Sequence, residues 1–97
     1  MLILIGRRLR LSVTIKDLLT DLNADPTELT LVLKPPQGAL ETYVWPTGSE
    51  IIKESVGEFY IDLTPDEVGQ YYFRWFSSGA VEDAAEGAFR IDAGKGF

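Results

Sequence analysis

The sequence contains neither cysteine nor histidine. Without cysteine the chain forms no disulfide and offers no thiolate to a metal ion, so its fold depends on packing alone. Histidine is the commonest general base and a usual metal ligand, and cysteine is the strongest protein nucleophile. Their joint absence leaves carboxylates as the main candidates for catalysis.

Long apolar runs are also missing. The run at residues 1–5 (MLILI) stops at Gly6 and Arg7, so it is too short for a signal-peptide core or a membrane span. No stretch of useful length shows the helical period of apolar residues. We therefore expect a chain that is synthesised in the cytoplasm without a signal peptide and has no membrane as partner.

Basic residues are few, and they are unevenly distributed. The chain has nine basic and fifteen acidic residues, and its net charge is −6. Arg7, Arg8, Arg10 and Lys16 lie in residues 1–16, which contain no acid, so the remainder has five bases against fifteen acids. Such an acidic body disfavours nucleic acid as a ligand, because neutralising phosphates needs a basic surface. The basic N-terminal segment could contact an acidic protein instead. The simpler interpretation is that Arg8 and Arg10 lie on the solvent-exposed face of a strand.

Several short segments alternate apolar and polar residues, which is the period of a strand with one dry face. In the first of them, Leu9, Leu11, Val13 and Ile15 form the dry face. Turn-forming residues separate the segments, and residues 80–86 are expected to form a loop with room for a brief helical turn. The expected strands are residues 8–16, 28–34, 40–45, 51–54, 58–63, 71–76 and 88–92. This pattern predicts an all-β fold, an antiparallel sandwich of about seven strands in one domain over residues 1–97. An SH3-like or OB barrel is the alternative.

Residues 63–75 (LTPDEVGQYYFRW) combine a turn, a glycine and an aromatic run. This order is that of a tyrosine corner, in which the hydroxyl of Tyr71 bonds to the main chain upstream and pins the crossing between two sheets. Alternation then places Tyr71, Phe73 and Trp75 in the core. The stretch resembles the immunoglobulin-like sandwich family, with Phe73 where that family has a cysteine. The resemblance implies an immunoglobulin-like sandwich without a disulfide.

One stretch of acids imitates a calcium-binding loop. Asp21, Asn23 and Asp25 match the first three ligand positions, but Pro26 stands where the loop needs glycine and Val32 where it needs a bidentate glutamate. We interpret residues 17–25 as a solvated loop with turn-forming carboxylates and expect no metal or other cofactor.

Two pairs of carboxylates, Asp66 with Glu67 and Glu82 with Asp83, are the remaining candidates for acid–base chemistry. A glycosidase pair must flank a cleft and have one pKa raised by burial, whereas these acids lie in predicted turns where water solvates them. The Ser-Ser-Gly at residues 77–79 has no basic partner and is an ordinary hairpin loop. We therefore expect the chain not to be an enzyme.

Aromatic residues outside the predicted core indicate a recognition surface. Tyr72, Arg74 and Phe76 should line the outer face of the sheet, with Tyr43 and Trp45 beside them. Aromatic side chains and arginine are enriched at the centres of protein interfaces. The alternative is that they form cross-strand pairs that cover the sheet. We take these five residues as candidate interface positions.

The two ends of the chain supply the other candidates. The apolar run before Gly6 has the length of a strand and is expected to add itself to the edge of a neighbouring subunit, as an assembly arm over residues 1–6. The alternative is that it completes the chain's own sheet. Residues 93–97 are expected to be a short tail. The candidate interface residues at the ends are Leu2, Ile3, Leu4, Ile5, Arg7, Arg8 and Phe97.

The chain as a whole resembles a group of small structural proteins of tailed bacteriophages and prophages. The motifs that carry the resemblance are DPT at 25–27, KPPQG at 34–38, GEFY at 57–60, GQYYFRW at 69–75 and EGAF at 86–89. It implies a virion component, such as a head decoration protein, whose partners are other virion proteins of the capsid or neck and copies of itself. A head–tail connector component is one alternative. A carbohydrate-binding or host-surface-binding module, with Trp45 and Pro46 at a loop tip, is the other.

Overall fold

The structure is a computed structural model that describes residues 3–4 and 6–93. Its regular elements are strands, seven of which form antiparallel ladders. The strands are β1 (Ile3–Leu4), β2 (Leu9–Thr14), β3 (Glu28–Lys34), β4 (Glu41–Trp45), β5 (Ile51–Ser55), β6 (Glu58–Leu63), β7 (Gly69–Ser78) and β8 (Ala84–Asp92).

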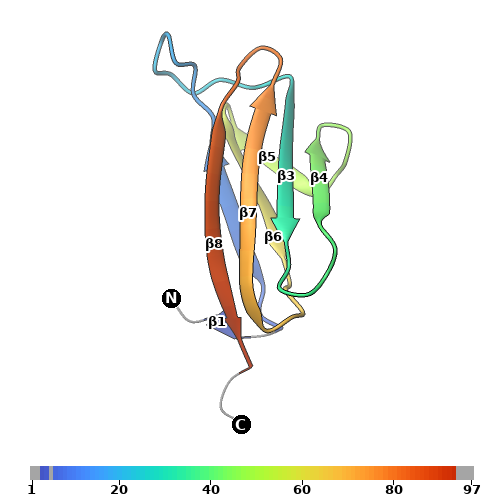
Figure 1. Cartoon of the computed structure of the whole chain (residues 1–97). Coiled ribbons are helices and arrows are strands. Elements are labelled where there is room, and N and C mark those ends of the chain that lie inside the picture. The colour runs from blue at the N-terminus through green and yellow to red at the C-terminus, as the bar shows by residue number, and fades with distance from the viewer. Residues whose placement is uncertain (1–2, 5, 94–97) are drawn as a thin grey trace.

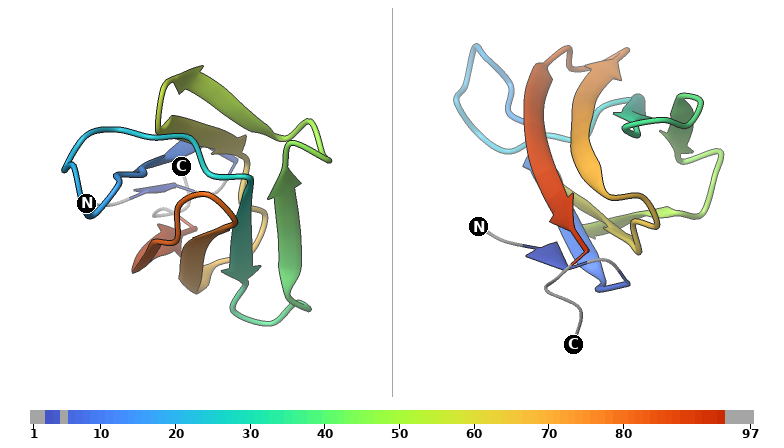
Figure 2. Two further views of the ribbon diagram at one scale, coloured as in Figure 1. Left: turned by 90° about the horizontal axis from the view of Figure 1, so that it is seen from above. Right: turned by 60° about the horizontal axis from the view of Figure 1, so that its bottom comes forward.

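The strands form two sheets that pack face to face (Figures 1 and 2). One sheet has the order β1-β8-β7-β3-β4 and the other has the order β2-β6-β5. The facing orders β8-β7-β3-β4 and β2-β6-β5 match strands G-F-C-C′ and B-E-D of an immunoglobulin-like sandwich. The predicted all-β antiparallel sandwich without a disulfide is therefore confirmed.

Alternation along each strand builds the core between the sheets. From the five-stranded sheet, Leu29, Leu31 and Trp75 are almost completely buried, and from the other sheet Phe59 and Ile61 face them. Burying such side chains is the main favourable contribution to folding, worth about 1.5 to 3 kcal/mol for each one fully buried. The residues predicted to face inward along the first strand (Leu9, Leu11, Val13 and Ile15) and along β7 (Tyr71, Phe73 and Trp75) all pack into the core.

The tyrosine corner is present. The backbone N–H of Glu67 donates a hydrogen bond of 3.1 Å to the Tyr71 hydroxyl oxygen, and the Tyr71 side chain is buried. Its ring stacks on Phe89 with centroids 4.9 Å apart. Next on the inner face, Phe73 packs opposite Gly87, where an added Cβ would lie 2.5 Å from the end of the Phe73 ring. Glycine at position 87 therefore makes room for the Phe73 ring.

The loop expected over residues 80–86 is shorter than predicted. No helical turn forms within residues 80–86, because β8 already begins at Ala84 and pairs with Phe76. Ser77 holds the tight connection, since its N–H donates to the Asp83 carbonyl at 2.9 Å and its hydroxyl donates to the Val81 carbonyl at 2.9 Å.

The expected pairing of the N-terminal run with a neighbour also differs from the structure. Ile3 and Leu4 form β1, which pairs in parallel with Ile91 and Asp92 at the edge of the chain's own sheet. β1 occupies the edge of β8 that lies opposite β7, so the main chain of β1 is paired without a second chain. The alternative arrangement, pairing within the domain, is the one found for these two residues.

Candidate binding surfaces

The outer face of the five-stranded sheet presents Tyr72, Arg74 and Phe76, as predicted. Their side chains point away from the core because Tyr71, Phe73 and Trp75 point into it. Tyr72 is 54% exposed and Phe76 is 38% exposed. We define these three residues as the outer aromatic face.

Neighbouring strands extend this face on both sides of β7. Arg74 lies between Val32 of β3 and Glu86 of β8, and its Nε is 3.5 Å from a Glu86 carboxylate oxygen. Both charged side chains are well exposed, so this ion pair contributes little to stability. A shallow hollow of about 190 Å³ lies beside them, lined by Val32, Lys34, Tyr72, Phe73, Arg74, Glu86 and Gly87. The face thus combines exposed rings, an arginine and a depression.

Tyr43 and Trp45 do not lie beside the outer aromatic face, so that part of the prediction was wrong. The register of β4 on β3 pairs Tyr43 with Leu31 and Trp45 with Leu29, which are buried leucines on the inner face. The Trp45 ring meets the Phe59 ring edge-on, with centroids 4.8 Å apart. Both aromatic residues of β4 are therefore half-buried packing residues at the margin of the core.

The candidate residues near the chain ends are placed only in part. Arg7 and Arg8 are exposed between β1 and β2. Ile3 and Leu4 belong to β1. The other three candidates, Leu2, Ile5 and Phe97, lie outside the described residues.

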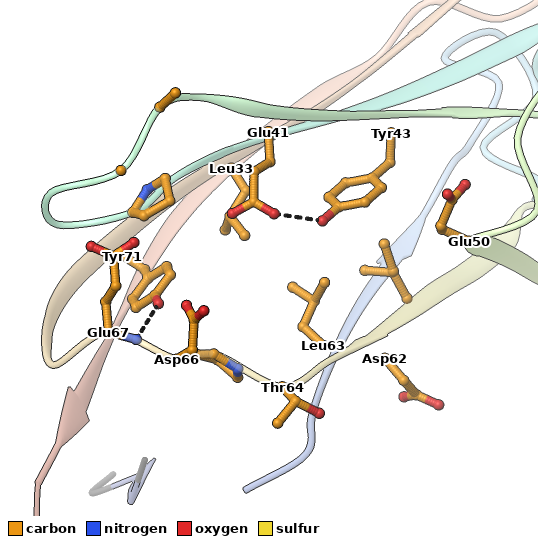
Figure 3. A pocket seen from close by; sticks show the side chains of 15 residues that line it. Leu33, Glu41, Tyr43, Glu50, Asp62, Leu63, Thr64, Asp66, Glu67 and Tyr71 are labelled. Carbon is orange, nitrogen blue, oxygen red and sulfur yellow. Dashed lines mark hydrogen bonds between the residues drawn. The ribbon is translucent and has the colours of Figure 1, made fainter. Parts of the chain in front are cut away.

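A cleft of about 570 Å³ opens between the two sheets, and sequence analysis did not anticipate it (Figure 3). Its buried lining includes Leu33, Ile61 and Tyr71. The charged residues among its lining are all acids, namely Glu41, Glu50, Asp62, Asp66 and Glu67. These acids belong to different strands and loops, so only the packing of the sheets brings them to one cleft.

Hydrogen bonds shape the walls of this acidic cleft. Glu67 accepts a bond of 3.0 Å from the backbone N–H of Gln37, which ties the β6–β7 loop to the β3–β4 loop. The Tyr43 hydroxyl donates to Glu41 at 2.9 Å. Partial burial, followed by the bond to Glu41 and the charge of Glu50, raises the pKa of Tyr43 to about 12. The side chain therefore stays a neutral donor at physiological pH.

The cleft can attract cations through the field of its carboxylates. Asp62 is already paired, because Arg10 donates to it at 2.8 Å and thereby lowers the pKa of this carboxyl. Among the residues that the structure describes, no three carboxylates are arranged to hold a metal ion. Asp66 and Glu67, which we expected only as water-solvated turn residues, do border a cleft.

Asp25, the third residue of the calcium-like pattern, is used to hold the chain together. Its carboxylate accepts a hydrogen bond of 2.8 Å from the backbone N–H of Gly57 and pairs with the Lys53 ammonium group. These two partners, Lys53 first, lower the pKa of Asp25. Gly57 has a φ of 73°, and an added Cβ would lie 2.5 Å from the Ile15 carbonyl oxygen, so the β5–β6 turn requires glycine here.

The β2–β3 connection exposes three leucines that sequence analysis overlooked. Leu18, Leu19 and Leu22 are 82%, 96% and 67% exposed in a segment that we had interpreted as a solvated polar loop. A signal was available, because residues 17–22 (DLLTDL) contain three leucines outside any strand alternation. We define residues 17–22 as the leucine loop.

Comparisons of the chain with protein-family models, curated proteins and solved structures find no match. Within residues 3–4 and 6–93 there is no helix with the length and apolarity needed to cross a membrane.

Proposed function

We propose that this chain is a non-enzymatic assembly module that attaches to a partner protein through the outer aromatic face. The observation that carries the proposal is the uncovered pair of rings, Tyr72 and Phe76, on either side of Arg74. Inner-face aromatics of the same strand already fill the core, so these rings are surplus to its packing.

The face has the physical character of an interface centre. Tyrosine and arginine dominate binding energy at interfaces because they bury large areas and form directional polar contacts with few rotatable bonds per contact. The antiparallel ladders with β3 and β8 hold all three side chains on a firm backbone. A partner therefore gains contact area with little loss of backbone entropy on binding.

The finer form of the proposal is a virion component of a tailed phage, with head decoration as the role. It is supported by the order of the five motifs between residues 25 and 91 and by a sheet face, held on paired strands, that suits repeated attachment to a shell. Host-surface binding through Trp45 is less well supported, because that ring packs against Phe59 and does not stand free as a platform for sugars.

The test compares two triple variants. In the first, Tyr72→Ser, Arg74→Ser and Phe76→Thr remove the outer aromatic face. In the matched control, Tyr60→Ser, Arg10→Ser and Ile52→Thr remove a tyrosine, an arginine and an apolar side chain from the other sheet, where Arg10 lies 3.8 Å over the Tyr60 ring and Ile52 pairs with Tyr60.

Cells that produce the chain are lysed, and each protein is located in the fractions of a density gradient. Circular dichroism of each purified protein checks that it is folded. We expect the wild type and the control to sediment with particles and the first variant to remain at the top of the gradient. A wild-type chain that never sediments with particles would refute the virion role. Undiminished sedimentation of the first variant would refute the use of this face.

A further inference from the structure

The leucine loop projects from one end of the sandwich, at the upper left of Figure 1, and nothing in the described part of the chain covers its three leucines. Single exposed apolar residues are normal on protein surfaces. Leu40, for example, stands alone in the β3–β4 loop at 63% exposure. Three leucines within one short projecting loop form a concentrated apolar surface of the kind that marks a contact site.

The loop has a defined shape. The Asp17 N–H donates to the Leu22 carbonyl at 2.9 Å, and the Asp21 N–H donates to the Asp17 carbonyl at 2.8 Å. The Asp17 carboxylate also accepts a bond of 2.8 Å from the Leu19 N–H, and the Leu22 N–H donates to Thr20 at 3.3 Å. Asp21 has a φ of 57°, a left-handed conformation that is uncommon outside glycine and costs energy to hold.

The base of the loop is fixed to the sandwich. Ile15 donates its N–H to the Gly57 carbonyl at 2.7 Å and accepts from the Ala24 N–H at 3.0 Å. Lys16 and Asn23 form a β-bridge, and Asp25 is held by Gly57 and Lys53. The leucines are therefore presented by a preorganised segment, which lowers the entropy lost on binding.

We infer that the leucine loop is a docking element whose three leucines enter an apolar pocket of a partner protein, with basic side chains at the rim of that pocket. We infer the basic rim from Asp17 and Asp21, which stand beside the leucines in the chain. Docking would remove water from these two carboxylates, and basic side chains of the partner would compensate for the lost hydration. A lipid surface fits less well, because cytoplasmic leaflets carry negative charge and would repel these two acids.

A second copy of this chain also fits poorly as the receptor. All charged residues that line its acidic cleft are acids, which would face Asp17 and Asp21 with like charge. Its other hollow is bordered by Lys34 and Arg74, but it is shallow and its volume of about 190 Å³ is too small to take three leucine side chains. The inference is independent of the outer aromatic face, which lies on the broad side of the sandwich and not at its end (Figure 1). Either surface can fail its test without affecting the other.

The first experiment identifies the contact in the producing cell. A photo-cross-linking residue replaces Leu19 in the full chain, and the same residue replaces Leu40 as a control. We expect position 19, and not position 40, to give one defined adduct whose cross-linked peptide maps to an apolar pocket bordered by lysine or arginine. Adducts with another copy of the chain, or none above the level at position 40, would overturn the inference.

The second experiment measures the affinity for the cross-linked protein after its purification. Leu18→Ser, Leu19→Ser and Leu22→Ser together should weaken binding by more than about 100-fold, since each leucine leaves water on docking. Leu40→Ser should change the affinity less than about twofold. Asp17→Asn with Asp21→Asn, which keeps the loop's acceptor and tolerates the left-handed conformation, should weaken binding and reduce its dependence on salt.

An equal loss of affinity in Leu40→Ser would show that general apolarity, and not the loop, drives binding. Stronger binding of the wild type than of the triple serine variant to phosphatidylcholine or phosphatidylserine vesicles would assign the leucines to a membrane. Unchanged affinity in the triple serine variant would remove the loop from the contact.

Discussion

Replacing Tyr71 by phenylalanine tests the hydrogen bond that defines the corner. The variant keeps the ring, which is 2% exposed and stacked on Phe89, and loses only the oxygen that accepts the Glu67 N–H. A typical hydrogen bond contributes about 0.5 to 1.5 kcal/mol to stability, and leaving a fully buried donor unpaired costs up to about 3 kcal/mol. Tyr71 and Glu67 both line the acidic cleft, so water can reach the abandoned N–H. We therefore expect a loss of about 1 kcal/mol.

Urea unfolding measures this loss. With a slope of about 1 to 1.5 kcal/mol per molar urea for a chain of this size, the midpoint should fall by about 0.7 to 1 M at unchanged slope. The thermal midpoint should fall by about 4 to 8 °C. Tyr72→Phe is the matched control, because the neighbouring tyrosine is 54% exposed, and its change should stay within about 0.5 kcal/mol. Equal midpoints for Tyr71→Phe and the wild type, or equal losses in the two variants, would refute the role of the corner bond.

Two further predictions concern titration. Partial burial and Glu41 raise the pKa of Tyr43 to about 12, and Glu41→Gln should lower this pKa in a spectrophotometric titration, because the hydrogen bond and the charge of Glu41 both disfavour the Tyr43 phenolate. A tyrosine titration curve that is the same in this variant and in the wild type would contradict the assignment. Asp25 has a folded-state pKa below its unfolded value near 3.8, so its contribution to stability is complete above that pH and is lost as the pH falls through the folded value. Below pH 4 the free energy of unfolding should accordingly fall less steeply with decreasing pH for Asp25→Asn than for the wild type. Identical pH profiles of the two proteins would count against the contacts with Lys53 and Gly57.

Local patterns in the sequence were sufficient for the strands and the corner. Period-2 alternation is a property of each segment alone, so Leu31, Phe59 and Trp75 could be assigned to the core without knowing their partners. The same reasoning placed Tyr72 and Phe76 outside, because side chains that alternate with buried ones must point away from them.

Tertiary structure decided the positions where local patterns were ambiguous. Residues 40–45 carry apolar or aromatic side chains on both faces, and only the pairing of Tyr43 with Leu31 put the aromatic residues inside. Similarly, β1 found its partner in Ile91 and Asp92, a contact that spans nearly the whole chain and leaves no local signal.

The acidic cleft and the exposure of the leucine loop were likewise decided by the tertiary structure and not by local sequence patterns. The cleft's acids, Glu41 and Glu67 among them, become neighbours only when the two sheets pack. The leucines of residues 17–22 were visible in the sequence, but apolar side chains in a loop can either fold under the sandwich or stand away from it. Hydrogen bonds within the loop and at its base hold them away, because they satisfy the backbone in a conformation that points the side chains to solvent. Exposure is thus a property of the assembled structure, whereas the strand pattern is a property of the chain.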